Sequence, residues 1–471
     1  MRPERLIPII VATALFMENT DSTVLATALP TIAADLRQDP IALKLALTSY
    51  LISLAVFIPV SGWMADRYGS RNVFRAALAV FLAGSLACAT AGSLGGFVAA
   101  RFLQGMGGAM MVPVGRLVML RSVPRHELIG AMAWLTMPAL IGPVVGPPLG
   151  GFITTYFNWR WIFLINVPVG IAGIVLATLY MDNIREEGRD RLDLIGFLTF
   201  GFGLALLMLG LSTGGRHLIP VEASIGMGVI GALLVTIYVR HSLRVAAPLV
   251  DLTLLRLPTL RNGMIGGSLF RLGVGAIPFL LPLMLQLGFG LSPLHSGLLT
   301  FASSAGALIM KTLAARILRR FGFRLVLAWN ALVAAALLAA IGFFTPATPP
   351  AVMLIVLLVG GCFRSLEFTA INTIVYAEVP ADRMSSATSL VSVAQQVAVS
   401  AGIALGAAVL DFVGRAHGDG VLDAGDFWPA FVAVASVSAS GMLFFIRLHP
   451  DAGAEMTGRA ALRSAPKADS V

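Results

Sequence analysis

The sequence predicts an all-α membrane protein with about fourteen transmembrane helices. Only 12% of the 471 residues are charged and 57% are hydrophobic, whereas soluble domains carry about 25% charged residues. The mean hydropathy is +0.87. Apolar runs of about twenty residues, each long enough to cross a hydrocarbon core of about 30 Å, recur along the whole chain. A chain so poor in charge cannot cover the surface of a water-soluble globule, so most of it lies in the membrane.

The apolar runs form two groups of six with a pair between them. Charge, Gly and Pro place the spans near 9–30, 44–65, 73–92, 96–119, 130–153, 161–180, 193–213, 221–240, 263–287, 294–314, 325–345, 351–376, 387–411 and 427–446. We therefore expect an N-terminal six-helix bundle over 1–181, a linker with two inserted helices over 182–261, a C-terminal six-helix bundle over 262–449 and a disordered cytoplasmic tail over 450–471.

An even number of spans places both termini on the same side of the membrane. Most Lys and Arg lie in the loops on that side, including the clusters at 185–191 and 316–324. Cytoplasmic loops are enriched in these residues. We therefore expect both termini to lie in the cytoplasm.

Several other classes of protein are disfavoured. The net charge of +9 comes from basic residues scattered between apolar runs, and nucleic-acid binding needs them on one domain face. Cys88 and Cys362 lie in apolar segments, so neither a disulfide framework nor a metal site is predicted. The run from Leu6 to Met17 could be a cleaved signal, but Glu18, Asn19 and Asp21 interrupt it.

An enzyme is also disfavoured, because all six histidines fall in loops or at helix edges and no HExxH or GxSxG motif is present. The chain has no GxxxxGK[ST] loop for ATP. No cofactor is predicted, and transport would draw its energy from an ion gradient.

The two groups of six share a short repeat. Asp66–Arg71 follows the second span, and Arg319–Arg324 follows the tenth, at the same place in each half. Parallel repeats are common in transporters, with the substrate site between the halves.

Several motifs resemble those of a known family. The loop Gly62–Arg71 resembles the signature between the second and third helices of the major facilitator superfamily. Further stretches resemble its fourteen-span drug:proton antiporters of the EmrB/QacA type: Asp21–Thr23 with Ala28–Ile32, Arg101–Ala109, Gly142–Gly151, and Asn158–Phe163 with Asn166–Pro168. The resemblance implies the major facilitator fold, with two six-helix bundles and an inserted pair, in the bacterial inner membrane.

Charge within a bilayer costs about 2.5–3.5 kcal/mol per residue on insertion scales, so each such residue needs a reason. Within the predicted spans we single out Glu18, Asp21, Arg101, Arg116, Arg271, Arg364 and Glu367.

Glu18 and Asp21 are three residues apart and share a helix face, where mutual repulsion would favour holding a proton. The resemblance places Asp21 at the family's first-helix acidic position, and Arg101 at the fourth-helix arginine that modulates its protonation. Glu18 is a candidate for proton coupling or for attracting cationic substrates. Alternatively, Glu18 only lies in a wet entrance, Asp21 pairs permanently with an arginine, and Arg101 reaches the outer interface.

The predicted substrate cavity contains Glu18, Gln104, Arg271, Arg364 and Glu367. Arg364 and Glu367 are three apart, so we expect an intrahelical ion pair, either purely structural or exchanged on protonation. Arg271 and Arg116 have no partner nearby in sequence and are expected to bond carbonyls or line water.

Two segments are predicted to move. The family resemblance makes Gly62, Asp66, Arg67, Gly69 and Arg71 a cytoplasmic gating loop. Gly142, Gly146 and Gly150 form one small-residue stripe, while Pro143, Pro147 and Pro148 would bend the helix. We interpret this stretch as an antiport hinge, with generic helix packing as the alternative.

The resemblance therefore implies export of hydrophobic or amphiphilic drug-like compounds in exchange for protons. Uptake of a specific metabolite or organic anion with protons is the alternative, and a non-transporting sensor is disfavoured by the intramembrane carboxylates. The expected partners are a small-molecule substrate, protons and the lipid bilayer, with no nucleic acid. An adaptor and an outer-membrane channel are possible partners that no segment of the sequence predicts.

Overall fold

The computed structural model describes residues 3–122, 128–185, 192–213, 219–245, 248–380, 383–417 and 422–454. The side chains of a few further helical residues, including Arg116 and residues 128–140, lie outside this description. Most of the predicted tail, from residue 455 onward, also lies outside the described residues.

The described chain is built from helices. The first half contains α1 (Pro3–Asp35), η1 (Pro40–Leu43), α2 (Lys44–Tyr68), α3 (Ser70–Thr90), α4 (Leu94–Ser122), α5 (Leu128–Tyr156), α6 (Trp161–Leu164) and α7 (Asn166–Tyr180). The inserted pair is α8 (Leu194–Thr213) and α9 (Val221–Ser242). The second half contains η2 (Leu252–Arg256), α10 (Pro258–Gly275), α11 (Ile277–Leu283), the π-helical turn η3 (Met284–Gly288), α12 (Pro293–Phe321), α13 (Phe323–Gly342), α14 (Pro350–Ile374), α15 (Met384–His417), η5 (Ala424–Asp426), α16 (Phe427–Ser440) and α17 (Met442–Phe445).

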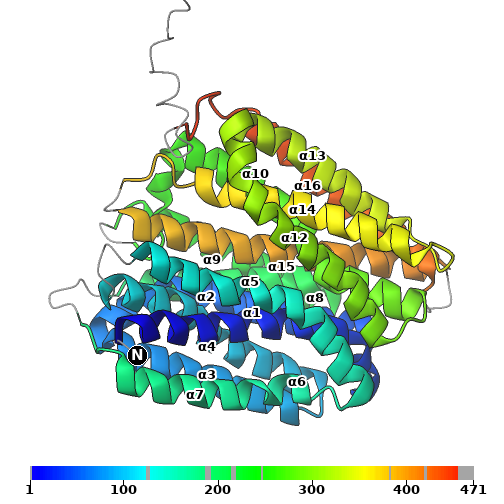
Figure 1. Ribbon diagram of the computed structural model, residues 1–471, viewed down its shortest axis with the longest axis horizontal. Coiled ribbons are helices and arrows are strands. Elements are labelled where there is room, and N and C mark those ends of the chain that lie inside the picture. The colour runs from blue at the N-terminus through cyan, green and yellow to red at the C-terminus, as the bar shows by residue number, and fades with distance from the viewer. Residues whose placement is uncertain are drawn as a thin grey trace, which may run out of the picture.

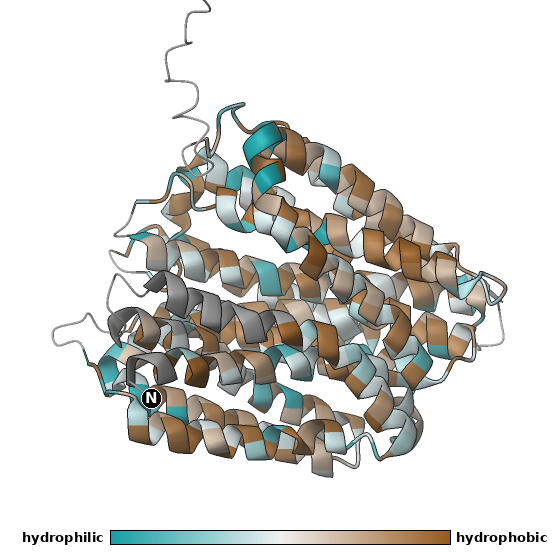
Figure 2. Cartoon of the chain, in the orientation of Figure 1, coloured by the Kyte–Doolittle hydropathy of each residue, from teal (hydrophilic) through white to brown (hydrophobic). Residues whose placement is uncertain are grey.

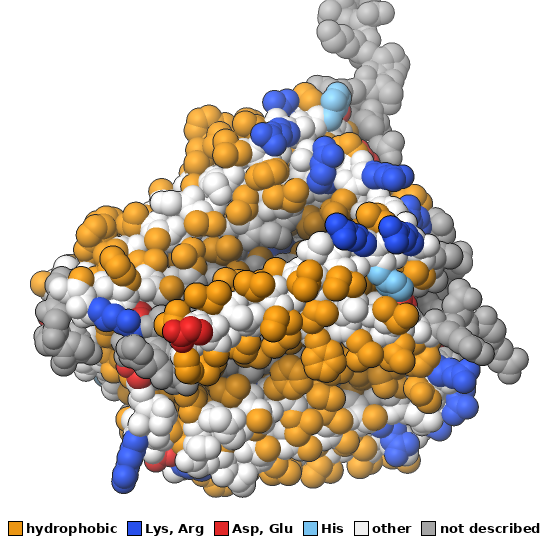
Figure 3. All heavy atoms as spheres, turned by 180° about the vertical axis from the view of Figure 1, so that it is seen from behind, with side chains coloured by type: hydrophobic (Ala, Val, Ile, Leu, Met, Phe, Trp, Pro, Cys, Tyr) orange, Lys and Arg blue, Asp and Glu red, His pale blue; other side chains and the backbone are white. Residues whose placement is uncertain are grey.

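Thirteen helical segments of the described chain are long and apolar enough to cross a membrane. The predicted span at 130–153 corresponds to α5, a further helix of 29 residues. Hydrophobic residues dominate along the helices, and the more hydrophilic ones gather toward the ends (Figure 2). On the face in Figure 3, hydrophobic side chains cover the middle, and most Lys and Arg lie toward one end. The prediction of an all-α membrane protein is confirmed.

Proline divides two of the membrane crossings into shorter helices. Pro168 has no N–H to donate to the carbonyl four residues earlier, at the point where α6 ends and α7 begins. Pro278 and Pro282 have the same effect between α10, α11 and η3, which together make one crossing from Pro258 to Gly288. The break before α7 places Asn166 at the first position of that helix.

The short sequence repeat corresponds to a repeated turn. Gly69 joins α2 to α3 with φ +93°, and Gly322 joins α12 to α13 with φ +79°. Each glycine N–H donates to the carbonyl four residues earlier, Ala65 or Leu318, at 2.9 Å. A positive φ strains residues with a Cβ, which accounts for glycine at both turns.

The two bundles share a hydrophobic core at the end where α1 finishes. The cluster around Leu36, Phe97, Phe163, Phe279 and Phe427 draws residues from both halves there. A further cluster joins α2 and α15 to the inserted helix α8, and each bundle also has a core of its own toward the end where α1 begins. One core lies among α1–α4 and α7, and another among α10 and α12–α15. Figure 1 shows the C-terminal bundle tilted against the N-terminal one, with the bundles approaching each other away from the label N.

Polar contacts across the two bundles reinforce the closed end. Gln286 Nε2 donates to the Thr27 carbonyl at 2.8 Å, and the Leu294 N–H donates to Thr155 Oγ1 at 3.2 Å. Lys44 at the start of α2 is 2% exposed and is attracted electrostatically by Asp411 on α15. Asp411 is also bound by Arg415 at 2.8 Å. The structure is therefore closed at the end where α1 finishes.

The inserted pair α8 and α9 packs outside the two bundles. The helices contact each other along their length, and α8 also contacts α2 and α15. Where α8 begins and α9 ends, His241 Nε2 lies 2.8 Å from Asp193 Oδ1. The pair therefore covers the seam between α2 and α15.

A substitution at Gly297 tests the closed end. A Cβ at Gly297 would lie 2.2 Å from the Pro147 carbonyl oxygen of the opposite bundle, whereas a Cβ at Gly226 meets nothing within 4 Å. We expect Gly297→Ala to destabilise the protein by about 1–3 kcal/mol through overpacking. Gly226→Ala should not destabilise it, because alanine favours helix. Thermal denaturation of the purified variants measures both, and equal midpoints would contradict the described contact.

Candidate functional site

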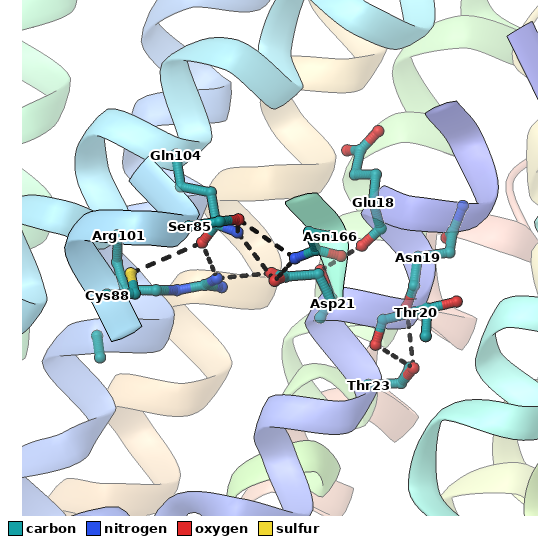
Figure 4. A network of polar contacts seen from close by, with 12 residues as sticks. Glu18, Asn19, Thr20, Asp21, Thr23, Ser85, Cys88, Arg101, Gln104 and Asn166 are labelled. Atoms are coloured by element: carbon teal, nitrogen blue, oxygen red, sulfur yellow. Dashed lines mark hydrogen bonds and ion pairs between the residues drawn. The ribbon is translucent and has the colours of Figure 1, made fainter. Parts of the chain in front are cut away.

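A polar network inside the N-terminal bundle centres on Asp21 of α1 (Figure 4). Asp21 is 2% exposed. Its Oδ2 lies 2.6 Å from Arg101 Nη1 on α4, and its Oδ1 accepts from Gln104 Nε2 and Asn166 Nδ2, both at 2.9 Å. Three donors from α4 and α7 thus meet at one carboxylate of α1.

Arg101 supplies the positive charge in this network. The side chain is 1% exposed, and its guanidinium stacks over the Tyr50 ring, 4.4 Å from the centroid. Buried charges are tolerated when they are paired and hydrogen-bonded. Asp21 and Arg101 are paired with each other, and both are hydrogen-bonded to the Gln104 amide.

Ser85 on α3 completes the network. Its Oγ accepts from Gln104 Nε2 at 2.8 Å and from Asn166 Nδ2 at 3.2 Å. Ser85 had no expected role, and Asn166 was expected only as part of a motif. The break at Pro168, which frees Asn166 to face the bundle, was the signal available for Asn166. No sequence signal marks Ser85.

Gln104 occupies a different place from the predicted one. Gln104 was expected in a substrate cavity, but its side chain is fully buried and bonds to Asp21. The reason is helical spacing, because Gln104 lies one turn after Arg101 on the same face of α4. Gln104 therefore belongs with Asp21 and Arg101.

Glu18 does not form a carboxylate pair with Asp21. Figure 4 shows the Glu18 side chain pointing away from the Asp21 network. Glu18 is partly exposed, and its Oε2 has no hydrogen-bond partner. The i, i+3 spacing places the two residues near each other on α1, but the donors on α4 and α7 orient only the Asp21 side chain. The two carboxylates share no hydrogen-bond partner in the described network, but the charge of Asp21 still acts on Glu18 electrostatically.

Arg364 and Glu367 do not pair with each other, which corrects the expected intrahelical ion pair. Glu367 is 0% exposed, and its Oε2 accepts from Asn330 Nδ2 of α13 at 2.7 Å. Arg364 instead donates through Nη2 to Ser303 Oγ of α12. Because α14 lies against both α12 and α13, each side chain finds a partner on a different neighbour. Glu367 consequently lies inside the C-terminal bundle.

Arg271 of α10 faces α14. Its Nη2 donates to Asn372 Oδ1 at 2.6 Å, and its guanidinium lies over the Phe368 ring, 5.3 Å from the centroid. The arginine is buried, while Asn372 is exposed. A side-chain amide therefore takes the place of the carbonyls or water expected from the sequence. The side chain of Arg116, for which the same expectation was made, lies outside the described residues.

The predicted gating loop docks against the segment after α7. Ser70 N–H donates to the Ile184 carbonyl at 3.0 Å, and Arg71 Nη1 contacts the Met181 carbonyl at 3.4 Å. Asp66 is buried, whereas Arg67 is exposed. A Cβ at Gly62 would meet nothing within 4 Å, whereas a Cβ at Gly69 would overlap Asn183. The loop is thus held within the N-terminal half in this state.

The Gly face of α5 packs against α1 beside the Asp21 network. A Cβ at Gly142 would lie 3.1 Å from Asn19, at Gly146 1.9 Å from Thr23 Oγ1, and at Gly150 2.3 Å from Thr27 Oγ1. Glycine at these three positions lets α5 approach α1 closely.

The opposite bundle contacts another face of the same helix. Because Pro147 has no N–H, the Pro143 carbonyl four residues earlier lacks its helical donor. Ser304 Oγ of α12 donates to that free carbonyl at 2.7 Å. The prolines of α5 thus create the acceptor that connects the two bundles, and α5 contacts both α1 and α12.

Comparisons with known proteins agree with this architecture. A family model described as Major Facilitator Superfamily matches residues 11–237 and 263–468. A relative from Klebsiella pneumoniae subsp. pneumoniae, named "Putative multidrug resistance protein MdtD", is 38% identical over 460 residues, 97% of each chain. A relative of the same name from Salmonella heidelberg is 39% identical over 414 residues, 87% of each chain.

Solved structures share the fold at low sequence identity. An auto-inhibited POT family peptide transporter aligns with a TM-score of 0.70 at 14% identity, covering 97% of each chain. The xylose transporter XylE from E. coli, in a partially occluded inward-open conformation, aligns with a TM-score of 0.62 at 14% identity, covering 95% of this chain and 98% of that one.

A double-variant cycle tests the buried ion pair. Asp21→Asn leaves Arg101 as a buried cation without its carboxylate, and we expect a destabilisation of about 3–5 kcal/mol. Asp21→Asn/Arg101→Gln removes both charges and should recover much of that loss. Thermal denaturation in detergent measures both variants. The ion pair as described would be refuted if the double variant were no more stable than Asp21→Asn.

Proposed function

Because the chain belongs to the major facilitator superfamily, we propose that it is a secondary active transporter that exports hydrophobic or amphiphilic drug-like compounds in exchange for protons. The relatives named for multidrug resistance support the substrate class. The single observation that supports proton coupling best is the Asp21–Arg101 pair, which is buried within a membrane-spanning bundle. We assign the protein to the bacterial inner membrane with both termini in the cytoplasm.

Under this assignment the closed end faces the periplasm, because α1 starts in the cytoplasm and finishes at that end. The structure then corresponds to a state that opens inward. The short Asp21–Arg101 contact is the arrangement of an ionised carboxylate. We propose that Asp21 has released its proton in the inward-facing state and that Arg101 stabilises the charge left behind.

A proton reaching Asp21 from the periplasm would weaken this pair. A neutral carboxyl group no longer compensates Arg101, whose guanidinium stays charged at any relevant pH. Gln104, Asn166 and Ser85 would have to exchange hydrogen bonds at the same time, since each is bonded within the same network. Protonation would therefore alter contacts among α1, α3, α4 and α7 in one step.

The motion proposed is a rocking of the two bundles about α5 and α12. The Gly face of α5 packs against α1, and the free Pro143 carbonyl accepts a hydrogen bond from Ser304 of α12. A change in α1 packing would thus reach the opposite bundle through a single helix. Rigid-body movement of repeats around a central site is the usual route of alternating access.

Efflux measurements test the proposal. In everted membrane vesicles, we expect the wild type to accumulate ethidium only when a proton gradient is imposed. Asp21→Asn should abolish this accumulation, because the exchanged proton loses its binding group. Size-exclusion chromatography of the purified variant verifies that it remains folded at the assay temperature. Accumulation that is independent of the gradient, or unchanged in Asp21→Asn, would contradict the proposal.

Glu18→Gln serves as the matched variant in the same assay. Because Glu18 lies outside the Asp21 network and one of its oxygens is unpartnered, we assign it to recognition of positive charge on the substrate. We expect Glu18→Gln to reduce ethidium accumulation by about tenfold, the effect of roughly 1.4 kcal/mol, while a neutral dye is still exported with the gradient. Equal loss for both dyes would instead place Glu18 in proton coupling.

A further inference from the structure

The C-terminal bundle contains a polar cluster that the Asp21 mechanism does not use. It consists of Arg271 on α10, Asn372 on α14 and Gln395 on α15. Arg271 Nη2 and Gln395 Nε2 both donate to Asn372 Oδ1, at 2.6 Å and 3.3 Å. Three helices thus bring their polar side chains to one oxygen atom.

The cluster is rich in donors and poor in acceptors. An arginine carries five N–H donors and no acceptor, and each side-chain amide carries two donors and one acceptor. The Asn372 oxygen already receives two donors. Most of the remaining capacity is N–H, so the group that would satisfy this cluster best is an oxygen acceptor.

Arg271 also lacks an acidic partner at ion-pair distance among the described residues. Tyr376 and Glu367 both attract Arg271 electrostatically, and the Glu367 carboxylate is bound to Asn330 of α13. A buried cation without a direct counterion favours an anionic ligand.

The cluster is accessible from one side. Asn372 is exposed and Gln395 is partly exposed, although Ile371 and Ile374 beside Asn372 are fully buried. The Phe368 ring lies under the Arg271 guanidinium and offers an apolar surface next to the charge. An amphiphile could therefore place an anionic group on Arg271 and its apolar body against Phe368.

We propose that Arg271, Asn372 and Gln395 form a recognition site for a carboxylate on the transported compound. This inference rests on the proposed transport function and adds to its substrates amphiphiles that carry an anionic group, beside the cationic ones assigned to Glu18. Arg271 binds the carboxylate through paired N–H groups, as a planar guanidinium does. In this structure Asn372 Oδ1 accepts from Arg271 Nη2. When the ligand binds, the Asn372 side chain turns so that its amide N–H groups face the carboxylate.

A matched pair of ligands tests this site. The probes are 1-pyrenebutyrate and its methyl ester, which differ only in the charge on the carboxyl group. Binding to the purified full chain in phosphatidylcholine nanodiscs is measured by fluorescence anisotropy without a proton gradient, with protein-free nanodiscs as the blank. We expect the wild type to bind the acid more tightly than the ester by about tenfold to hundredfold, the range of a charge-assisted hydrogen bond.

Three variants separate recognition from general damage. Arg271→Gln should remove the preference for the acid and leave ester binding unchanged, and Arg271→Lys should retain only part of it, because an ammonium cannot bind both oxygens in parallel. Arg244→Gln, at an exposed arginine after α9, should behave as the wild type. Equal binding of acid and ester by the wild type, or equal loss of both in Arg271→Gln, would overturn the proposal.

A lipid headgroup offers the same anionic chemistry, so a second set of nanodiscs contains phosphatidylglycerol. Unchanged 1-pyrenebutyrate binding in these nanodiscs supports a substrate site, and displacement from the wild type would overturn it in favour of a lipid site. Gradient-driven ethidium efflux by the wild type is measured separately. If efflux fails while the acid is bound selectively, the transport proposal fails and the carboxylate site stands. If efflux persists without acid selectivity, only the carboxylate site fails.

Discussion

The structure of the N-terminal bundle depends on the compensation of one buried negative charge. Asp21 is accessible to almost no solvent, and three side chains donate hydrogen bonds to it. This requirement accounts for the positions of the three donors. Arg101 and Gln104 lie one turn apart on α4, and Asn166 lies at the proline-induced start of α7. Loss of the charge on Asp21 would leave these groups without the charge they compensate, in a network that joins four helices.

The helix α5 transmits such a change because its two faces have different chemistry. Glycines on one face let α1 approach so closely that most side chains would overlap Thr23 or Thr27. Proline on the other face leaves a backbone carbonyl free for Ser304 of the opposite bundle. Small displacements of α1 cannot be absorbed at a close-packed interface. The same helix is thus in contact with α1, which carries Asp21, and with the partner bundle.

Local sequence signals predicted the architecture and the central pair. Apolar runs located the helices, the repeat at Asp66 and Arg319 marked equivalent turns, and the intramembrane charges identified Asp21 and Arg101. Side-chain partners could not be predicted, because they depend on which helices are neighbours. Arg364 and Glu367 have the spacing of an ion pair, yet Ser303 and Asn330 on flanking helices bind them instead. Ser85 has no distinguishing pattern in the sequence.

The central claim is that the proton exchanged for substrate binds at Asp21. The most direct measurement is proton release from the purified protein when a transported compound is added, followed with a pH indicator in weakly buffered detergent solution. The account predicts release by the wild type and no release by Asp21→Asn. Equal release by both proteins would contradict it, because the exchanged proton would then be bound elsewhere.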